Sequence, residues 1–219
     1  TGAHNSSFTG NITLDKAATL TSDASGTATF STGVISGAGA ITKSGAGTVV
    51  LSGANTYSGG TTISAGTIKL DAGVLCGSSP GSACASDNAS IFSSAIGRGN
   101  LTISAGATLD LNGKNIGDSF IAANPTMTMS GTGTGSNQAL LINSSSTASA
   151  TVFGPITLTK IAATASTLTN LIAQNAGTGT LTIAGVIADG SGTNVAGLQI
   201  GQTGYTGSVI LSGNNTYAG

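Results

Sequence analysis

The chain has 219 residues, of which 35 are glycine and only 6% are charged, and its formal net charge is −1 at pH 7. The charged fraction lies far below the ~25% that is typical of soluble domains. A balance so close to neutral offers no electrostatic attraction for nucleic acid or for an anionic membrane surface. The scarcity of Glu, Lys, Arg and Leu, together with many Gly and Thr residues, disfavours helices and favours short strands between turns.

Short strands separated by Gly, Asn and Ser follow one another along the whole chain. Hydrophobic residues make up 39% of the sequence and alternate with polar ones, which argues against a disordered Gly/Ser-rich chain. In chain order, the predicted strands are Ala28–Phe30, Ala40–Lys43, Thr48–Leu51, Thr61–Ser64, Thr67–Leu70, Leu101–Ile103, Thr108–Leu111, Thr126–Met129, Ala139–Ile142, Thr151–Phe153, Thr157–Thr159, Thr180–Ile183 and Ser208–Leu211.

Strands of three or four residues suit a coil in which each turn contains three strands and three corners. We therefore predict an all-β fold, a parallel β-helix (β-solenoid) that forms a single unit over residues 1–219. About 20–25 residues per turn is usual for such repeats, which gives roughly nine or ten turns.

The alternation of apolar and polar residues predicts which side chains point into the coil. Val49 and Leu51 are expected inside, as are Ile68 and Leu70 in the next strand, with Lys69 outside. The sequence TISAG occurs at 62–66 and again at 102–106. After the second copy, Leu109 and Leu111 are expected inside, and Asp110 outside in the place of Lys69.

The segment from Asp71 to Gly99 breaks this pattern. It contains Cys76 and Cys84, the first proline of the chain, and a sequence near residues 89–96 that is compatible with a short helical turn. We interpret residues 71–99 as an excursion from the coil, either functional or merely decorative. An even cysteine pair in a chain of exported character predicts a disulfide between Cys76 and Cys84.

A longer motif also recurs. Residues 47–59 read GTVVLSGANTYSG and residues 207–219 read GSVILSGNNTYAG, with nine identities over thirteen positions. A repeat of this length indicates a repeat architecture. Because the second copy stops before the strand that follows the first copy, we expect the chain to be a segment of a longer protein. Its last turn is then incomplete and exposes unpaired strand edges.

The string LSGANTYSGGTTISAGTIKL (51–70) resembles the autotransporter-associated β-strand repeat, which is also called the passenger-associated transport repeat of bacterial type V secretion. The resemblance rests on Leu51, Gly53, Asn55, Tyr57, Gly59 and Gly66, and in the second copy on Leu211, Gly213, Asn215 and Tyr217. It implies a right-handed parallel β-helix displayed on the outer surface of a Gram-negative bacterium. It also implies that membrane contact is made only through a C-terminal β-barrel that this sequence does not contain.

Physical reasoning assigns the motif residues a structural role. Asn55 and Asn215 occur where a side-chain amide can bond a neighbouring turn at a corner. Tyr57 and Tyr217 can cover the edge of the apolar interior. For all four residues, we favour this role over ligand binding.

A carbohydrate-active β-helix is the alternative function, because many right-handed β-helices cleave acidic polysaccharides. Such sites need clustered carboxylates with a cation, and the Asp residues here are widely separated in sequence. Asp71 and Asp110 are the candidates that stacking of turns could bring together, and we favour a solvated position on the outer wall for both. The only histidine, His4, offers little support for a Ser-His-Asp site.

Other sites are also disfavoured. Cys76 and Cys84 are two ligands short of a zinc site, so no metal and no cofactor is expected. A minor alternative is an ice-binding solenoid, suggested by the Thr-x-Thr elements at 126–128, 157–159 and 180–182. These elements are not regularly spaced in sequence, and outward Thr is common on solvated strands.

The function that we predict is that of a surface-exposed autotransporter passenger segment, a structural and adhesive rod in bacterial attachment or self-association, without enzymatic turnover. The expected partners are host-cell or neighbouring bacterial surface molecules, including other copies of the protein, and no nucleic acid. The expected location is the bacterial cell surface or the medium.

Overall fold

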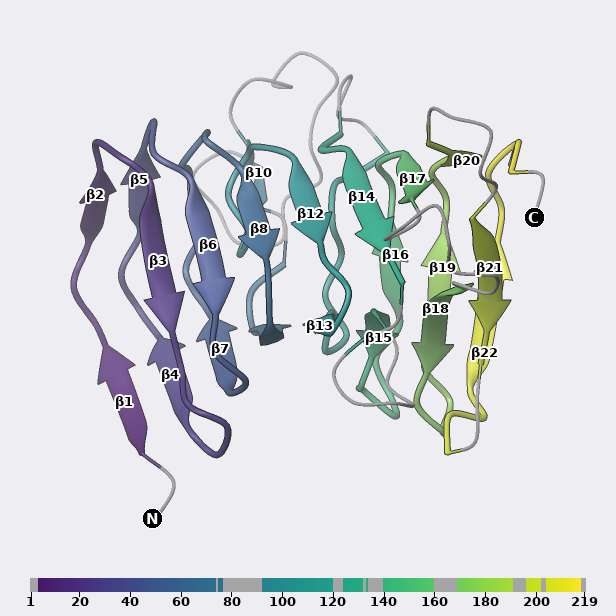
Figure 1. Ribbon diagram of the computed structural model, residues 1–219, viewed down its shortest axis with the longest axis horizontal. Helices are drawn as coiled ribbons and strands as arrows, with labels where there is room; N and C mark the ends of the chain where they lie inside the picture. The colour runs from purple at the N-terminus through teal and green to yellow at the C-terminus, as the bar shows by residue number, and fades with distance from the viewer. Residues whose placement is uncertain are drawn as a thin grey trace.

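The computed structural model describes residues 4–73, 75–76, 92–119, 124–131, 133, 140–159, 169–190, 196–201 and 204–217. For residues 75, 76, 92, 93 and 169, only the backbone is described. The described residues form a parallel β-solenoid whose turns follow one another along the long axis of the molecule (Figure 1). The all-β, parallel β-helical fold class is therefore confirmed, and the right hand of the coil stays a prediction.

One wall of the coil is an eight-stranded parallel sheet with one strand from every turn. In hydrogen-bonded order, its strands are β1 (Asn5–Phe8), β4 (Thr27–Phe30), β7 (Thr48–Leu51), β9 (Gly66–Leu70), β13 (Ala107–Asp110), β15 (Leu141–Asn143), β18 (Thr169–Gln174) and β21 (Gly197–Ile200). In Figure 1, β4 and β7 point upward whereas β18 and β21 point downward. The sheet therefore turns about the long axis between its two ends, as twisted sheets do.

The second wall is a seven-stranded parallel sheet, whose front strands lie side by side in Figure 1. It contains β3 (Ala18–Thr21), β6 (Ile41–Ser44), β8 (Thr61–Ile63), β12 (Leu101–Ile103), β14 (Met127–Ser130), β17 (Ile156–Thr159) and β20 (Ile187–Asp189).

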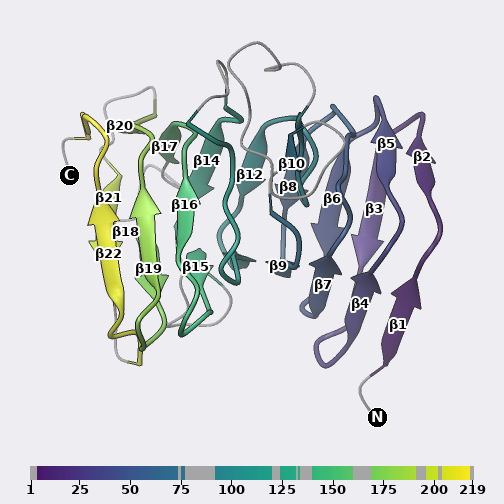
Figure 2. The ribbon, with the colours of Figure 1, turned by 180° about the vertical axis from the view of Figure 1, so that it is seen from behind.

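The third wall is built in two parts. One is the pair β2 (Ile12–Leu14) and β5 (Ile35–Gly37), and the other contains β16 (Ala150–Val152), β19 (Thr180–Ile183) and β22 (Ser208–Leu211), seen from behind in Figure 2.

Side chains of one kind stack in columns inside the coil because each strand pairs in register with the next. Val49 pairs with Ile68, which pairs with Leu109, and all three side chains are fully buried. Leu51, Leu70 and Leu111 are buried in the neighbouring column. The inward positions predicted from the alternation are therefore confirmed. The two TISAG copies also lie in register, since Thr62 pairs with Thr102.

The length of a turn differs from the prediction in the second half of the coil. Thr48 pairs with Thr67, 19 residues later, whereas Leu109 pairs with Leu141, 32 residues later. Most of this difference lies in the corner between the seven- and the eight-stranded sheet, since β8 ends at Ile63 and β9 begins at Gly66, whereas β14 ends at Ser130 and β15 begins at Leu141. Over the described residues, the eight-stranded sheet has one strand for each of eight turns, fewer than the predicted nine or ten.

The predicted excursion at 71–99 contains a short antiparallel hairpin of β10 (Leu75–Cys76) and β11 (Phe92–Ser93). The helical turn predicted near 89–96 is absent from the described part of that range, because β11 is extended and Ser94 bridges Asn55 in antiparallel fashion. The expected Cys76–Cys84 disulfide involves a residue outside the described ranges and stays a prediction. Across the described residues, no helix is long and apolar enough to cross a membrane.

Part of the outer face of the eight-stranded sheet is not solvated. Ile142, Leu171 and Ala173 form a buried cluster separate from the main core, and Tyr205 packs against it. Asp110 on the same face is also buried, with 7% of its surface exposed. The outward direction predicted for Asp110 is right, but the solvated position expected for it is wrong.

We predict that two adjacent valines on β7 differ sharply in their contribution to stability. Val49 is fully buried, whereas Val50 faces outward and is partly exposed. Val49→Ala removes two buried carbons and leaves a cavity, so it should lower the free energy of unfolding by about 2 kcal/mol. The matched change Val50→Ala should stay within about 0.5 kcal/mol of the wild type. Urea unfolding of the two variants measures the difference, and equal losses would contradict the inward assignment.

Candidate functional site

The first copy of the recurring motif forms the corner between β7 and β8. Leu51 ends β7 and is fully buried. At Gly53, an added Cβ would lie only 2.3 Å from the carbonyl oxygen of Gly33 in the preceding turn. The missing side chain therefore allows the two turns to approach at this corner.

Asn55 ties three successive parts of the coil together. Its side chain is 1% exposed, and its Oδ1 accepts a hydrogen bond from the Ile35 backbone N–H at 2.8 Å. Its Nδ2 donates to the Ala95 carbonyl oxygen at 2.7 Å. Backbone groups at a corner lack strand partners, so the side-chain amide satisfies groups that would otherwise be buried without a hydrogen bond.

Tyr57 lies inside the coil with none of its surface exposed. Its hydroxyl lies 2.5 Å from Thr61 Oγ1, and that Thr61 hydroxyl donates to the Ile96 carbonyl oxygen at 3.0 Å. Because the Thr61 hydrogen is engaged there, the tyrosine hydroxyl is the donor of the first bond. Burial raises the pKa of Tyr57 well above its usual value, so the hydroxyl stays protonated.

Gly59 and Gly66, the remaining glycines of the motif, also allow two turns to lie close together. A Cβ at Gly59 would lie 2.5 Å from the backbone nitrogen of Ala40. Gly66 has a φ of 68° and would place a Cβ 2.4 Å from the Gly45 and Gly47 carbonyl oxygens. Both the positive φ and the short distance favour glycine at this corner.

The second copy makes the same contacts with a different preceding turn. A Cβ at Gly213 would lie 2.3 Å from the Gly185 carbonyl oxygen. Asn215 Oδ1 accepts a hydrogen bond from the Ile187 backbone N–H at 2.9 Å. Leu211 and Tyr217 are partly buried and pack against the main core.

A comparison with protein families identifies this motif. Residues 41–70 and 205–219 match the family described as the passenger-associated-transport-repeat. The chain carries passenger-associated transport repeats. No curated protein and no solved structure matches the chain. The repeat implies a function associated with autotransporter passengers, and with it display at the cell surface or secretion.

The two passenger-associated transport repeats lie in different walls of the coil. In the first, β7 belongs to the eight-stranded sheet, and Asn55 bonds the first residue of β5 in the third wall. In the second, β22 belongs to the third wall, and Asn215 bonds the first residue of β20 in the seven-stranded sheet. The repeat therefore specifies a strand, a corner and the start of a strand, and it does not specify a particular wall.

Lys43 is a buried charged residue that the sequence analysis did not single out. It stacks inside the coil between Leu20 and Ile63 and has no exposed surface. Its Nζ donates to three carbonyl oxygens, those of Ser44 at 2.7 Å, Gly45 at 2.6 Å and Ala65 at 3.1 Å. Burial lowers the pKa of Lys43 from 10.5 to about 8. The alternation Ile41-Thr42-Lys43 was the signal in the sequence that places this side chain inside.

The two carboxylates considered for a polysaccharide site have separate partners. Asp110 lies 3.6 Å from Lys69 and accepts backbone hydrogen bonds from Asn112 at 2.9 Å and Ser144 at 3.0 Å. Asp71 accepts a hydrogen bond from the Ser52 hydroxyl. Among the described residues, no three His, Cys, Asp or Glu side chains gather in a group that could hold a metal ion.

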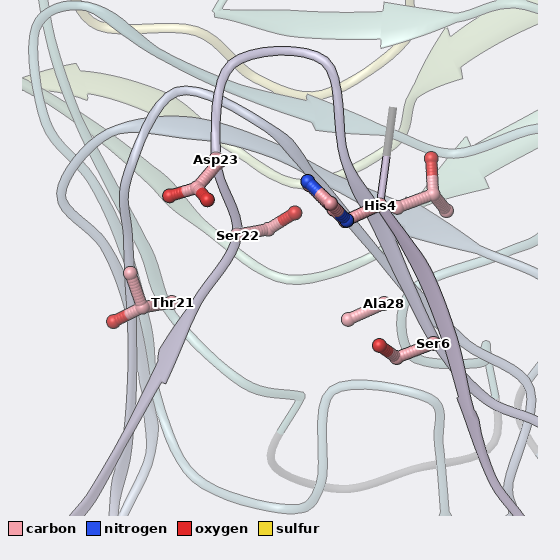
Figure 3. Close-up of a pocket in the computed structure, with 7 residues that line it drawn as sticks. His4, Ser6, Thr21, Ser22, Asp23 and Ala28 are labelled. Atoms are coloured by element: carbon pink, nitrogen blue, oxygen red, sulfur yellow. The ribbon is translucent and has the colours of Figure 1, made fainter. Parts of the chain in front are cut away.

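His4 lines a hollow of about 170 Å³ with Ser22, Asp23 and other small polar residues. The Ser22 hydroxyl donates to the Gly26 carbonyl oxygen at 2.9 Å. Figure 3 shows the Asp23 carboxylate on the far side of Ser22 from the His4 ring. A Ser-His-Asp site needs the histidine between the other two residues, so this arrangement does not support nucleophilic catalysis.

We predict that Gly97→Ala is far more damaging than Gly106→Ala. The two glycines have nearly the same φ, 74° and 78°. At Gly97, a Cβ would lie 2.7 Å from the Tyr57 carbonyl oxygen and 2.8 Å from its ring, whereas at Gly106 nothing lies within 4 Å. Gly106→Ala should therefore show only the backbone strain of a positive φ, about 1 kcal/mol, and Gly97→Ala about 1–3 kcal/mol more. Denaturant unfolding tests this order, and equal losses would contradict the packing of Tyr57.

The lowered pKa of Lys43 predicts a pH dependence of stability. Below pH 8, the side chain is protonated in both the folded and the unfolded state. Between about pH 8 and about pH 10.5, the folded state binds fewer protons, so the free energy of unfolding rises with pH. Relative to Lys43→Met, the wild type should therefore gain stability only in this window, by at most about 1.4 kcal/mol per pH unit. Unfolding both proteins across this range is the measurement. If the free energies of unfolding of the wild type and Lys43→Met differ by the same amount at every pH, the three carbonyl oxygens stabilise the ammonium ion as well as water does.

Proposed function

We propose that the chain is part of an autotransporter passenger and acts as a structural and adhesive rod in bacterial attachment or self-association. The observation that carries this proposal is the pair of passenger-associated transport repeats, which make the same glycine and asparagine contacts within a parallel coil. The partners would be molecules on host cells or on neighbouring bacteria, including other copies of the same protein.

The construction of the coil supports the rod role. Each turn hydrogen-bonds only to the turns before and after it, so the coil can grow as the chain emerges, one turn at a time. Such growth suits a protein that folds after crossing a membrane as an extended chain. The inward columns of Val, Ile and Leu then hold successive turns together.

The chemistry of the surface supports adhesion rather than turnover. Among the described residues, the side chains with clearly shifted pKa values are Lys43 and Tyr57, and both are buried and bonded within the corners. The outer positions of the seven-stranded sheet carry threonines on six successive strands, which offer many weak hydrogen bonds along one wall. Binding through such a surface depends on many simultaneous contacts.

The test uses the complete natural protein in a Gram-negative host. An antibody against an epitope tag placed outside residues 4–217, together with a protease added to intact cells, would report surface display of the wild type and of the deletion. Attachment to host cells and clumping of bacteria are then compared between the wild type and a deletion of residues 4–217. The proposal expects display of the wild type and loss of attachment or clumping in the deletion. A protein that stays inside the cell, or a displayed deletion with unchanged attachment and clumping, would overturn it.

The enzymatic alternative is checked with the same purified chain. Incubation with acidic polysaccharides, followed by ultraviolet absorbance for unsaturated sugars, should show no product. Product that is lost on Asp71→Asn or Asp110→Asn would contradict the assignment of a structural and adhesive role.

A further inference from the structure

The outer face of the seven-stranded sheet carries a regular file of threonines. Register pairs connect one threonine on each of six successive strands. These residues, called here the threonine file, are Thr19, Thr42, Thr62, Thr102, Thr128 and Thr157. In the sequence, Thr-x-Thr elements occur at 126–128, 157–159 and 180–182 without regular spacing. The structure brings Thr128 and Thr157 into register despite turns of unequal length, whereas Thr180 and Thr182 lie on β19 in the third wall.

A second file of hydroxyl side chains runs beside the first, two residues further along each strand. Its members, called here the mixed file, are Thr21, Ser44, Ser64, Ser104, Ser130 and Thr159. Thr21 pairs with Ser44 and Ser130 pairs with Thr159 in the sheet register. Their side-chain oxygens are also close, with 2.8 Å between Thr21 Oγ1 and Ser44 Oγ and a hydrogen bond between Ser130 and Thr159.

The two files form a neutral and rigid grid. Neighbouring strands lie about 4.8 Å apart, and residues two apart along a strand lie about 6.6 Å apart. Threonine has a stiff χ1 torsion because it is β-branched, which favours a common orientation of successive hydroxyls. Directly beneath the grid, the inward side chains of the same strands, such as Ile41, Ile63 and Ile103, are buried in the main core and fix the strands in place.

The face is open, unlike its counterpart on the eight-stranded sheet. Thr19 is exposed, and the other five residues of the threonine file are partly exposed. On the eight-stranded sheet, the Lys69–Asp110 ion pair interrupts the outer face, and Ile142 is covered. The third wall has Thr151 and Thr182 in register, but the next outward position is Ile210. The open hydroxyl grid is therefore a property of one wall.

The composition of the grid limits what it can bind. It has no aromatic ring for stacking on a sugar and none of the aromatic or Arg anchors typical of protein interfaces. It has no cation for nucleic acid. It does present alternating methyl and hydroxyl groups at fixed intervals in two directions. Water next to methyl groups is restricted in orientation, and hydroxyls at regular spacing can hold that ordered layer in place.

We propose that the threonine file and the mixed file form a binding face for ice. The surface of ice repeats in two dimensions, as the grid does. It is also neutral and rich in hydrogen-bond donors and acceptors. This inference goes beyond the proposed function, because it assigns one wall of the rod to a non-biological surface and does not depend on attachment to cells.

The experiment measures ice binding by the purified chain of 219 residues. Fluorescently labelled protein should coat a growing single ice crystal, and the protein should slow the growth of ice grains and show thermal hysteresis. Thr102→Lys, at the centre of the threonine file, should reduce the activity by roughly tenfold, since the ammonium group stays hydrated and keeps the face away from ice. Thr182→Lys in the third wall is the matched control and should retain full activity.

A milder variant guards against unfolding. Thr102→Ser keeps the hydroxyl and removes only the methyl group, so the coil should keep its thermal unfolding midpoint while the activity falls. Three outcomes would overturn the proposal: no activity in the wild type, equal losses in Thr102→Lys and Thr182→Lys, or no loss in either Thr102 variant. Retention on an immobilised polysaccharide that Thr102→Lys abolishes, without any effect on ice, would assign the face to glycans instead.

Discussion

The close approach of one turn to the next is the constraint on which the whole molecule depends. Parallel strands hydrogen-bond only at about 4.8 Å, so the corners must stack as closely as the strands do. At Gly33, Gly53, Gly185 and Gly213, an added Cβ would lie within 2.3 Å of a carbonyl oxygen in the turn before. Glycine at these corners keeps successive strands in register, and the register in turn produces the columns of buried Val, Ile and Leu.

The same stacking buries corner carbonyl and N–H groups that need hydrogen-bond partners inside the coil. Corner carbonyl and N–H groups have no strand partners, and a buried group without a hydrogen bond is costly. Asn55, Asn143 and Lys43 meet these needs with side chains, and each is fully or almost fully buried. Asn143, for example, accepts from the Gly113 N–H at 2.7 Å and donates to the Ala148 carbonyl oxygen at 2.9 Å. The polar chemistry of the interior therefore serves the fold.

The outer faces of the three walls differ in their chemistry, and this difference bears on what each face can bind. A coil with identical strands would present three similar faces, but here one face is partly covered, one is built from separate short sheets and one is an open hydroxyl grid. A rod that displays different chemistry in different directions can make a cell contact on one side and keep another side available. The passenger-associated transport repeats appear in two different walls because their contacts need only a strand and the corner after it.

The sequence by itself determined the fold class, the family of the repeat and the direction of most strand side chains, including Val49, Leu51, Ile68 and Leu109. These features follow from local alternation and from a motif that is continuous in the chain. Only the tertiary structure decided which strands pair, because the corner after β14 is much longer than the corner after β8, and pairing depends on distance in space. Pairing in turn placed Asp110 beside Lys69, buried Lys43 among three carbonyl oxygens and joined Thr62, Thr102 and Thr128 into one file. Apart from the Ser44 and Gly45 carbonyl oxygens, which are neighbours of Lys43 in the chain, these contacts join residues from different turns, so they depend on strand pairing rather than on the alternation within one strand.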